Sequence, residues 1–268
     1  MIRRRGLLAL AGLTVQAGWG REVPAQGHSQ GVVRVSSPPG PTADMLEQVR
    51  QLAGARGLSV QVALRSDDQR ASHDLETGAL DAAAFDSGVA FADGLRRHPG
   101  RRVAAATTLT QPMALYSRRL SAPSQLRDGD DVVVPDNAAD LARALVLLQN
   151  YGLIELRDDT GLHATLNDVV PTSHRPRIVT VPAARLHAAL DLAPMVAMAS
   201  ADALHAGLLP GRDSIGTEDA RAPFAGLLAV RRDRLDEPWV AALLAELHGE
   251  DMKRYLLARF GNSVGRPW

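Results

Sequence analysis

The chain has 268 residues, of which 46% are hydrophobic and 22% charged, so it can form one large domain or two small ones and is not disordered. Thirty basic residues balance thirty acidic ones, and this formal charge of zero argues against nucleic acid as a partner. Because cysteine is absent, disulfides, thiolate metal sites, cysteine nucleophiles and lipid attachment to a cysteine are excluded.

Residues 1–27 have the pattern of an export signal. Three arginines at 3–5 precede a short apolar run at 6–13, and small residues follow at 23–25. The apolar run is roughly half as long as a membrane-spanning helix, and Arg4-Arg5 with the leucines that follow resembles a twin-arginine signal. A disordered basic tail is the alternative. We expect a soluble mature chain in the periplasm that, without a cysteine, is not a lipoprotein.

Short β-type segments alternate with helical ones along the rest of the chain. Thr42 stands where a helix N-cap is expected, apolar residues follow at helical spacing, and Gly54 and Gly57 end the pattern. This strand–helix–strand order predicts a βαβ unit, with a parallel sheet covered by helices. Strands are expected at 31–35, 58–64, 132–134, 177–181, 194–198 and 227–230, and helices at 42–57, 73–79, 124–129, 141–152 and, as one or two helices, 239–260.

Two successive α/β sets indicate two lobes. We expect residues 28–115 to form the first part of lobe 1 and residues 116–207 to form lobe 2. Residues 208–268 are then expected to return to lobe 1 and to end it with the C-terminal helices.

No motif in the chain predicts catalysis or a cofactor. Residues 261–265 spell a nucleophile-elbow pattern, but that mechanism needs a later histidine and only three other residues follow. Phosphate-cradling and dinucleotide-binding glycine motifs are absent, and the eight histidines never occur at the i, i+4 spacing that seats a metal on a helix. We therefore predict neither a catalytic residue nor a metal nor a cofactor.

The segment Val132–Leu156, VVVPDNAADLARALVLLQNYGLIEL, resembles the methionine-binding lipoproteins of ABC importers, the NLPA-type substrate-binding family. It combines a buried strand, a proline-containing turn and a helix that carries Arg143 in its opening turns. Further segments similar to the family follow in the same order at 40–44, 78–85, 112–117, 206–208 and 223–225. The resemblance covers nearly the whole mature chain, although this chain lacks the lipidated cysteine of the family.

The resemblance implies an α/β, two-lobed type II periplasmic binding protein fold, in which each lobe is a mixed sheet flanked by helices. A small-molecule ligand would lie in the cleft between the lobes, which close by a hinge motion. Such a protein is not an enzyme. It delivers its ligand to an ABC permease powered by an ATPase, and we expect it to act as a monomer.

Arg143 is the first candidate for ligand binding. A helix N-terminus presents free N–H groups to an anion, and an arginine there adds a planar fork that can grip a carboxylate. The matching arginine of the family anchors the ligand carboxylate. The alternative is that Arg143 only pairs with a surface acid.

The other candidates are Phe85, Asp68, Ser87 and Asp140. Phe85 matches a family aromatic that packs on the ligand, or is a core side chain. Asp68, Ser87 and Asp140 replace a tyrosine, a histidine and an asparagine of the family. Either aspartate could hold an α-ammonium group, or could be merely solvated.

Amides that the family uses for its ligand are also lost, because alanine occupies positions 199 and 201 and glycine occupies position 226. We therefore expect a small carboxylate such as an amino acid or organic acid, with methionine-like specificity in doubt. A periplasmic sensor or adaptor with the same fold is the alternative function. An enzyme on this scaffold would need a nucleophile–base pair, which we do not find.

Overall fold

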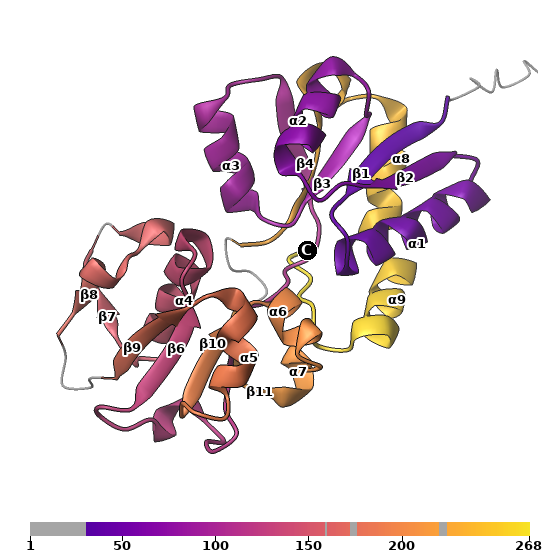
Figure 1. The fold of residues 1–268 in the computed structure, drawn as a ribbon. Helices are drawn as coiled ribbons and strands as arrows, with labels where there is room; N and C mark the ends of the chain where they lie inside the picture. Colours follow the sequence, from indigo (N-terminus) through magenta and orange to yellow (C-terminus); the bar gives the residue numbers. More distant parts are fainter. Residues whose placement is uncertain (1–30, 159, 172–175, 220–223) are drawn as a thin grey trace, which may run out of the picture.

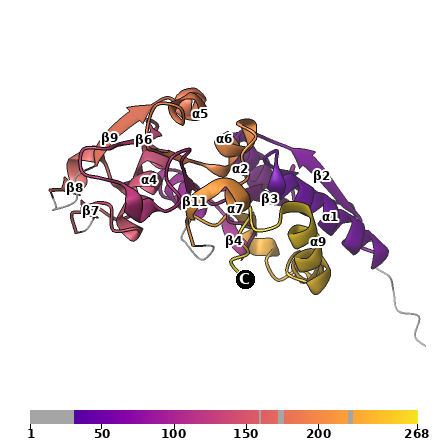
Figure 2. The same cartoon turned by 90° about the horizontal axis from the view of Figure 1, so that it is seen from below.

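The computed structural model describes residues 31–158, 160–171, 176–219 and 224–268, and Figure 1 shows two lobes joined by crossing segments. The predicted export signal lies outside the described residues. Figure 2 shows the lobes side by side along the long axis of the molecule. The predicted α/β fold, with a mixed sheet flanked by helices in each lobe, is confirmed. Among the described helices, none is long and apolar enough to cross a membrane.

Lobe 1 is built on a five-stranded mixed sheet. Its strands, in spatial order, are β2 (Val60–Leu64), β1 (Val33–Ser37), β3 (Ala82–Phe85), β12 (Leu227–Arg231) and β4 (Arg102–Thr107). Strand β1 is parallel to β2 and β3, whereas β12 is antiparallel to both β3 and β4. The C-terminal part of the chain therefore completes the middle of the first sheet.

Helices cover both faces of this sheet, because its strands are apolar on both sides. One face packs against α1 (Pro41–Ala55), α8 (Pro238–Leu247) and α9 (Glu250–Phe260). The other face packs against α2 (Asp68–Thr77) and α3 (Gly88–Arg97). Alternate residues of β3 point to opposite faces, so that Ala82 belongs to one cluster and Ala83 to the other.

The beginnings of two helices in lobe 1 differ from our predictions. Helix α1 is capped by Gly40, whose φ of 111° needs a residue without Cβ, and Pro41 follows as its first residue. Thr42 therefore lies inside the first turn and not at the cap. Helix α2 begins at Asp68, several residues before the predicted start at 73, because Asp67 caps it by accepting hydrogen bonds from the amides of residues 69 and 70.

Lobe 2 contains a second five-stranded mixed sheet. Its strands, in spatial order, are β11 (Ser214–Thr217), β5 (Ala114–Tyr116), β10 (Met195–Met198), β6 (Asp131–Pro135) and β9 (Arg177–Val181). A separate pair, β7 (Glu155–Leu156) and β8 (Val169–Val170), lies at the outer end of this lobe. The helix predicted at 124–129 is only a 3₁₀ turn at Pro123–Gln125.

In the described part of lobe 2, four helices accompany this sheet: α4 (Ala138–Asn150), α5 (Leu186–Ala189), α6 (Ser200–His205) and α7 (Pro210–Asp213). Helix α4 buries Ala144, Leu145 and Leu148 against β6 and β10. The sheet pairing places residues 114–217 in lobe 2, whereas we predicted 116–207. The end of lobe 2 lies later than predicted because β11 pairs with β5 before the chain returns to lobe 1.

Candidate functional site

Two crossover segments run side by side between the lobes. The first crossover joins β4 to β5 through residues 108–113, and the second joins β11 to β12 through residues 218–226, of which 218–219 and 224–226 are described. The amide of Thr108 donates to the carbonyl of Gly226 at 2.8 Å, and the amide of Gly226 donates to the carbonyl of Leu109 at 2.8 Å. Backbone bonds between Thr110 and Gly265 add the C-terminal segment to the same junction. We call this junction of residues 108–113, 218–219, 224–226 and 265 the hinge.

Arg143 reaches this hinge from the second turn of α4. Its Nε donates to Oε1 of Glu218 at 2.7 Å, and its Nη2 donates to Oε2 of Glu218 at 2.5 Å. Nη2 also donates to the carbonyl of Gln111 at 2.6 Å, and the guanidinium carbon lies 4.9 Å from the ring centre of Phe224. The side chain of Arg143 is 14% exposed and that of Glu218 is 3% exposed. Arg143 therefore bonds to both crossovers at once.

This geometry differs from the alternative interpretation, in which Arg143 only pairs with a surface acid. It is paired with an acid, but the acid is buried at the hinge and not on the surface. Glu218 also accepts a hydrogen bond from the amide of Met113 at 2.8 Å, so both of its oxygens are held. Three of the five guanidinium N–H groups thus bond to the protein itself.

Phe85 lies at the end of β3 and is 1% exposed. Its ring centre is 5.1 Å from that of Phe91, and both belong to the core cluster beneath α2 and α3. Phe85 also forms part of the wall of a pocket of about 620 Å³ between these helices, which Asp68 lines as well. The structure therefore places Phe85 both in the core and at a cavity.

Asp68 and Asp86 lie near one another at the carboxyl ends of β2 and β3. Burial, followed by the charges of Asp86 and Asp67, raises the pKa of Asp68 above its ordinary value. Burial also raises the pKa of Asp86, although hydrogen bonds from Thr42, at 2.6 Å, and from the Gln111 side chain oppose the shift. Gln111 thus connects Asp86 of lobe 1 to Arg143 of lobe 2.

Asp140 and Asp202 form a similar pair on lobe 2. Asp140 lies in the first turn of α4, where its carboxylate accepts a hydrogen bond at 3.0 Å from the side chain of the capping residue Asn137. Asp202 lies in the first turn of α6, and burial, followed by the charge of Asp140, raises its pKa while His205 opposes the shift. These two carboxylates follow β6 and β10, at the carboxyl ends of neighbouring parallel strands.

Ser87 has a local structural contact in lobe 1. It caps α3, and its hydroxyl accepts a hydrogen bond from the amide of Ala90 at 3.1 Å. Serine is favoured at this position because it satisfies one of the free amides of the first turn. Its contacts therefore explain the residue without a ligand.

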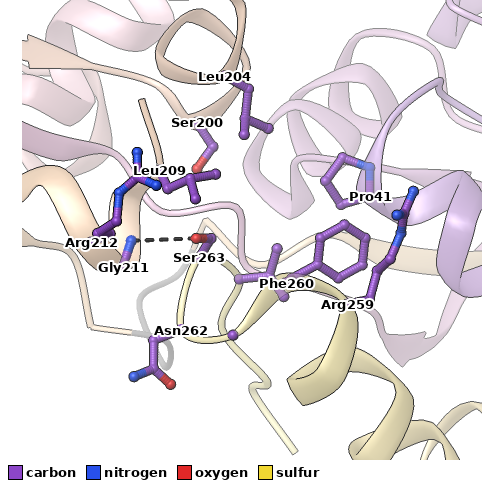
Figure 3. Close-up of a pocket in the computed structure, with 12 residues that line it drawn as sticks. Pro41, Ser200, Leu204, Leu209, Gly211, Arg212, Arg259, Phe260, Asn262 and Ser263 are labelled. Carbon is purple, nitrogen blue, oxygen red and sulfur yellow. Dashed lines mark hydrogen bonds between the residues drawn. The ribbon is translucent and has the colours of Figure 1, made fainter. Parts of the chain in front are cut away.

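A pocket of about 350 Å³ separates the lobes beside the hinge (Figure 3). Pro41 and Phe260 line it from lobe 1, and Ser200, Leu204 and Leu209 line it from lobe 2. The amide of residue 211 donates to the hydroxyl of residue 263 at 3.4 Å across its edge. A crevice between the lobes is therefore present. Its lining is mostly apolar but includes Arg212 and Arg259, and none of the five predicted binding residues lines it. Among the described residues, no group of three acids and histidines is placed to hold a metal ion.

Replacing Asp86 with asparagine is expected to stabilise the protein at pH 7 and to change its stability less near pH 3. The pKa of Asp86 is raised in the folded state, so between the ordinary value of about 3.9 and the raised value the folded state binds more protons than the unfolded state. The contribution of Asp86 to the free energy of unfolding therefore falls as the pH rises through this interval. Asparagine keeps an acceptor for Thr42 without the charge. Urea unfolding at both pH values measures the difference.

Asp168→Asn is the control of opposite sign. Hydrogen bonds from the Thr165 side chain and amide, and from Arg157, lower the pKa of Asp168 to about 2. This stabilisation is present above the ordinary pKa and is lost as pH falls through about 2, so the variant should be less stable than the parent at pH 7. A destabilising effect of Asp86→Asn at pH 7 would contradict the argument.

Sequence reasoning missed Asp86, Gln111 and Glu218, which the structure brings to the junction of the lobes, and Asp202, which lies beside Asp140 in lobe 2. Only Asp202 had a sequence signal, because it follows the strand predicted at 194–198, whereas the strand before Asp86 was not predicted. No local sequence pattern could indicate that Glu218 pairs with Arg143, because the two residues are 75 positions apart in the chain.

Comparisons with known proteins agree with this architecture. A family profile described as NlpA lipoprotein matches residues 33–268. The chain is 31% identical over 215 residues to the "D-methionine-binding lipoprotein MetQ" of Escherichia coli K12, with 79% of each chain covered. An ABC transporter periplasmic substrate-binding protein from Coxiella burnetii is similar in structure, with a TM-score of 0.71, 30% identity and coverage of 87% of this chain and 98% of that one.

A nutrient binding protein from Burkholderia cenocepacia, solved bound to methionine, is also similar. Its TM-score is 0.73 at 28% identity, and the match covers 88% of this chain and 100% of that chain. The profile match spans nearly all of the described residues, in both lobes. The chain belongs to the NlpA lipoprotein family.

Proposed function

We propose that this chain is the extracytoplasmic solute-binding protein of an ABC importer, and that it holds an amino acid or a related small ligand between its lobes. The observation that carries the proposal is the hinged two-lobed fold of this family, in which charged side chains of both lobes meet at the hinge. The ligand would pass to a membrane permease driven by an ATPase. The relatives are named as binding proteins, which supports a role without catalysis.

Methionine is the first ligand to test. We expected a different carboxylate because the family's amides are lost, but the relatives favour a methionine-like ligand. In this proposal Asp68, Asp140 and the neighbouring aspartates face the ligand ammonium group, and Arg143 lies on the carboxyl side. Phe85 and Ser87 are kept in this proposal as lobe 1 candidates, although Phe85 lines the separate pocket between α2 and α3 and Ser87 caps α3.

The experiment is a thermal-shift measurement on residues 28–268 with L-methionine, D-methionine, other amino acids and small organic acids. A ligand that binds only the folded state stabilises it by mass action, by about 2.7 kcal/mol at a concentration one hundred times Kd. We expect a concentration-dependent rise in Tm for a methionine-like compound. If no compound in the series raises Tm, the proposed function is wrong.

A further inference from the structure

The pocket of about 620 Å³ between α2 and α3 has no lining residue in common with the crevice beside the hinge. Its volume lies in the range of small-molecule sites. Small side chains line it from both helices, namely Ser72 from α2 and Ala90 from α3, and Gly94 of α3 lines it as well. Neighbouring helices on one face of a sheet normally fill the space between them with their own side chains, so this opening indicates a place for a ligand.

The buried part of the lining is aromatic and carries one cation. Phe85, Phe91 and Arg102 are the buried residues among the described residues that line the pocket. The centres of the two rings lie 5.1 Å apart with the rings tilted by 54°, and the guanidinium carbon of Arg102 lies 5.9 Å from the ring centre of Phe91. A tilted pair of rings can accept a third ring or an alkyl chain. The inner wall therefore suits the apolar body of a ligand.

Arg102 has an unused donor at this wall. Its Nη1 donates to Oε1 of Glu76 at 3.0 Å, and its Nη2 donates to the carbonyl of His98 at 3.2 Å. Its side chain is 7% exposed, and its Nε is buried without a hydrogen-bond partner among the described residues. Buried donors in proteins are nearly always paired, and an acceptor oxygen of a ligand would pair this one.

Arg97 adds a second cation at the same end of the pocket, because it directly precedes His98. It is the last residue of α3, and it has no ion pair or side-chain hydrogen bond among the described residues. The acids of the described lining are Glu76, which is paired with Arg102, and Asp68, which lies at the other end, where α2 begins. The end of the pocket at Arg97 therefore has a net positive charge, which favours an anion.

We infer that the pocket between α2 and α3 is a second ligand site, specific for amphipathic carboxylates. The aromatic or aliphatic body of the ligand lies against Phe85 and Phe91, and its carboxylate meets the guanidinium groups of Arg97 and Arg102. This inference goes beyond the proposed function, because the site lies within lobe 1 and requires neither lobe 2 nor closure of the lobes.

Three probes of nearly the same size test the inference by calorimetry, on the same protein as the thermal-shift measurement. 3-Phenylpropanoate carries a carboxylate, 3-phenylpropanamide carries no charge, and 3-phenylpropylamine carries an ammonium group. We expect the carboxylate to bind at least about tenfold more tightly than the amide, because only the carboxylate forms an ion pair with arginine, and the amine to bind more weakly still. Equal binding of the carboxylate and the amide overturns the inference, and so does binding of none of the three. Neither result bears on the binding of methionine, by which the proposed function is tested.

Arg97→Gln removes the unpaired cation without breaking an ion pair of the described residues. We expect it to weaken the binding of 3-phenylpropanoate by about tenfold. Arg96→Gln is the matched control, because Arg96 is the preceding residue of α3 but pairs with Asp93 and does not line the pocket. This control should bind 3-phenylpropanoate as the parent does. Equal affinity in Arg97→Gln and the parent contradicts the inference.

Gly94→Leu fills the pocket from α3. A Cβ at Gly94 meets nothing within 4 Å, so the new side chain can enter the open space, and we expect it to abolish the binding of 3-phenylpropanoate. Gly54→Leu is the control, because its Cβ also meets nothing within 4 Å and it lies in α1, outside the pocket. Methionine should bind to Gly94→Leu and to Arg97→Gln as to the parent. Loss of both compounds in these variants would assign them to one site, which overturns the inference and leaves the proposed function standing.

Discussion

Replacing Arg143 with alanine is expected to lower the free energy of unfolding by about 3–5 kcal/mol. The substitution leaves the Glu218 carboxylate buried, with the amide of Met113 as its one remaining described partner. An unpaired buried charge is costly because it has lost its hydration without gaining a counter-ion. Urea denaturation with matched m-values measures the effect.

Two further variants show whether the cost comes from the unpaired charge. Removing both charges in Arg143→Met with Glu218→Met should restore most of the stability, because apolar replacement of a buried pair is often nearly neutral. Arg259→Ala breaks the exposed pair with Asp44 and should cost no more than about 1 kcal/mol. If Arg143→Ala is as stable as the parent, the pair does not hold the hinge. Ligand affinities of Arg143→Ala should therefore be measured only on folded protein.

Gly226→Ala is expected to destabilise the protein by about 1–3 kcal/mol. A Cβ at this position would lie 2.6 Å from Oγ1 of Thr108, 2.7 Å from the carbonyl oxygen of Phe85 and 3.2 Å from that of Leu109. Two of these atoms are backbone and cannot rotate away, and hydrogen bonds fix the two crossovers against each other. Thermal or urea unfolding of the variant measures the cost.

Gly54→Ala is the matched control, because its Cβ meets nothing within 4 Å on the exposed side of α1. It should stabilise the protein by about 0.4–1 kcal/mol, since alanine loses less backbone entropy in a helix. Equal stability of Gly226→Ala and the parent would contradict the argument. The family resemblance leads us to expect an asparagine at position 226. If Gly226→Ala has the expected cost, the substitution Gly226→Asn would also require one of the crossovers to move.

Strands rich in β-branched residues could be located from the sequence alone. The strand at 177–181 was placed with its observed bounds, and those at β6 and β12 were placed within one residue at each end. Strand β3 was not predicted because three of its four residues are alanine, which has a low preference for strands. All four residues are buried, so the segment also lacks the alternation of apolar and polar residues that marks a strand. Helix α3 was also missed, because glycine at positions 88 and 94 weakens a helical pattern.

The candidate site could be predicted only in part. The position of Arg143 followed from its helix and from the family resemblance, but its partner did not, because the pair joins residues far apart in the chain. Residues 108–113 and Glu218 come together only when both crossovers are formed. Such a junction has no periodicity in the sequence, so spacing could not reveal it.

The position of β12 in the first sheet has a consequence for the order of assembly. All strands of lobe 2 lie in one continuous stretch from residue 114 to residue 217, whereas β3 and β4 share β12 as their common neighbour. As the nascent polypeptide emerges from its N-terminus, lobe 2 has its complete set of strands before β12 exists. Until Leu227–Arg231 has been synthesised, the edges of β3 and β4 that pair with β12 are open to pairing with other chains. We therefore expect the insertion of β12 between β3 and β4 to limit the rate of folding. We expect lobe 2, whose strands are continuous in the chain, to fold first.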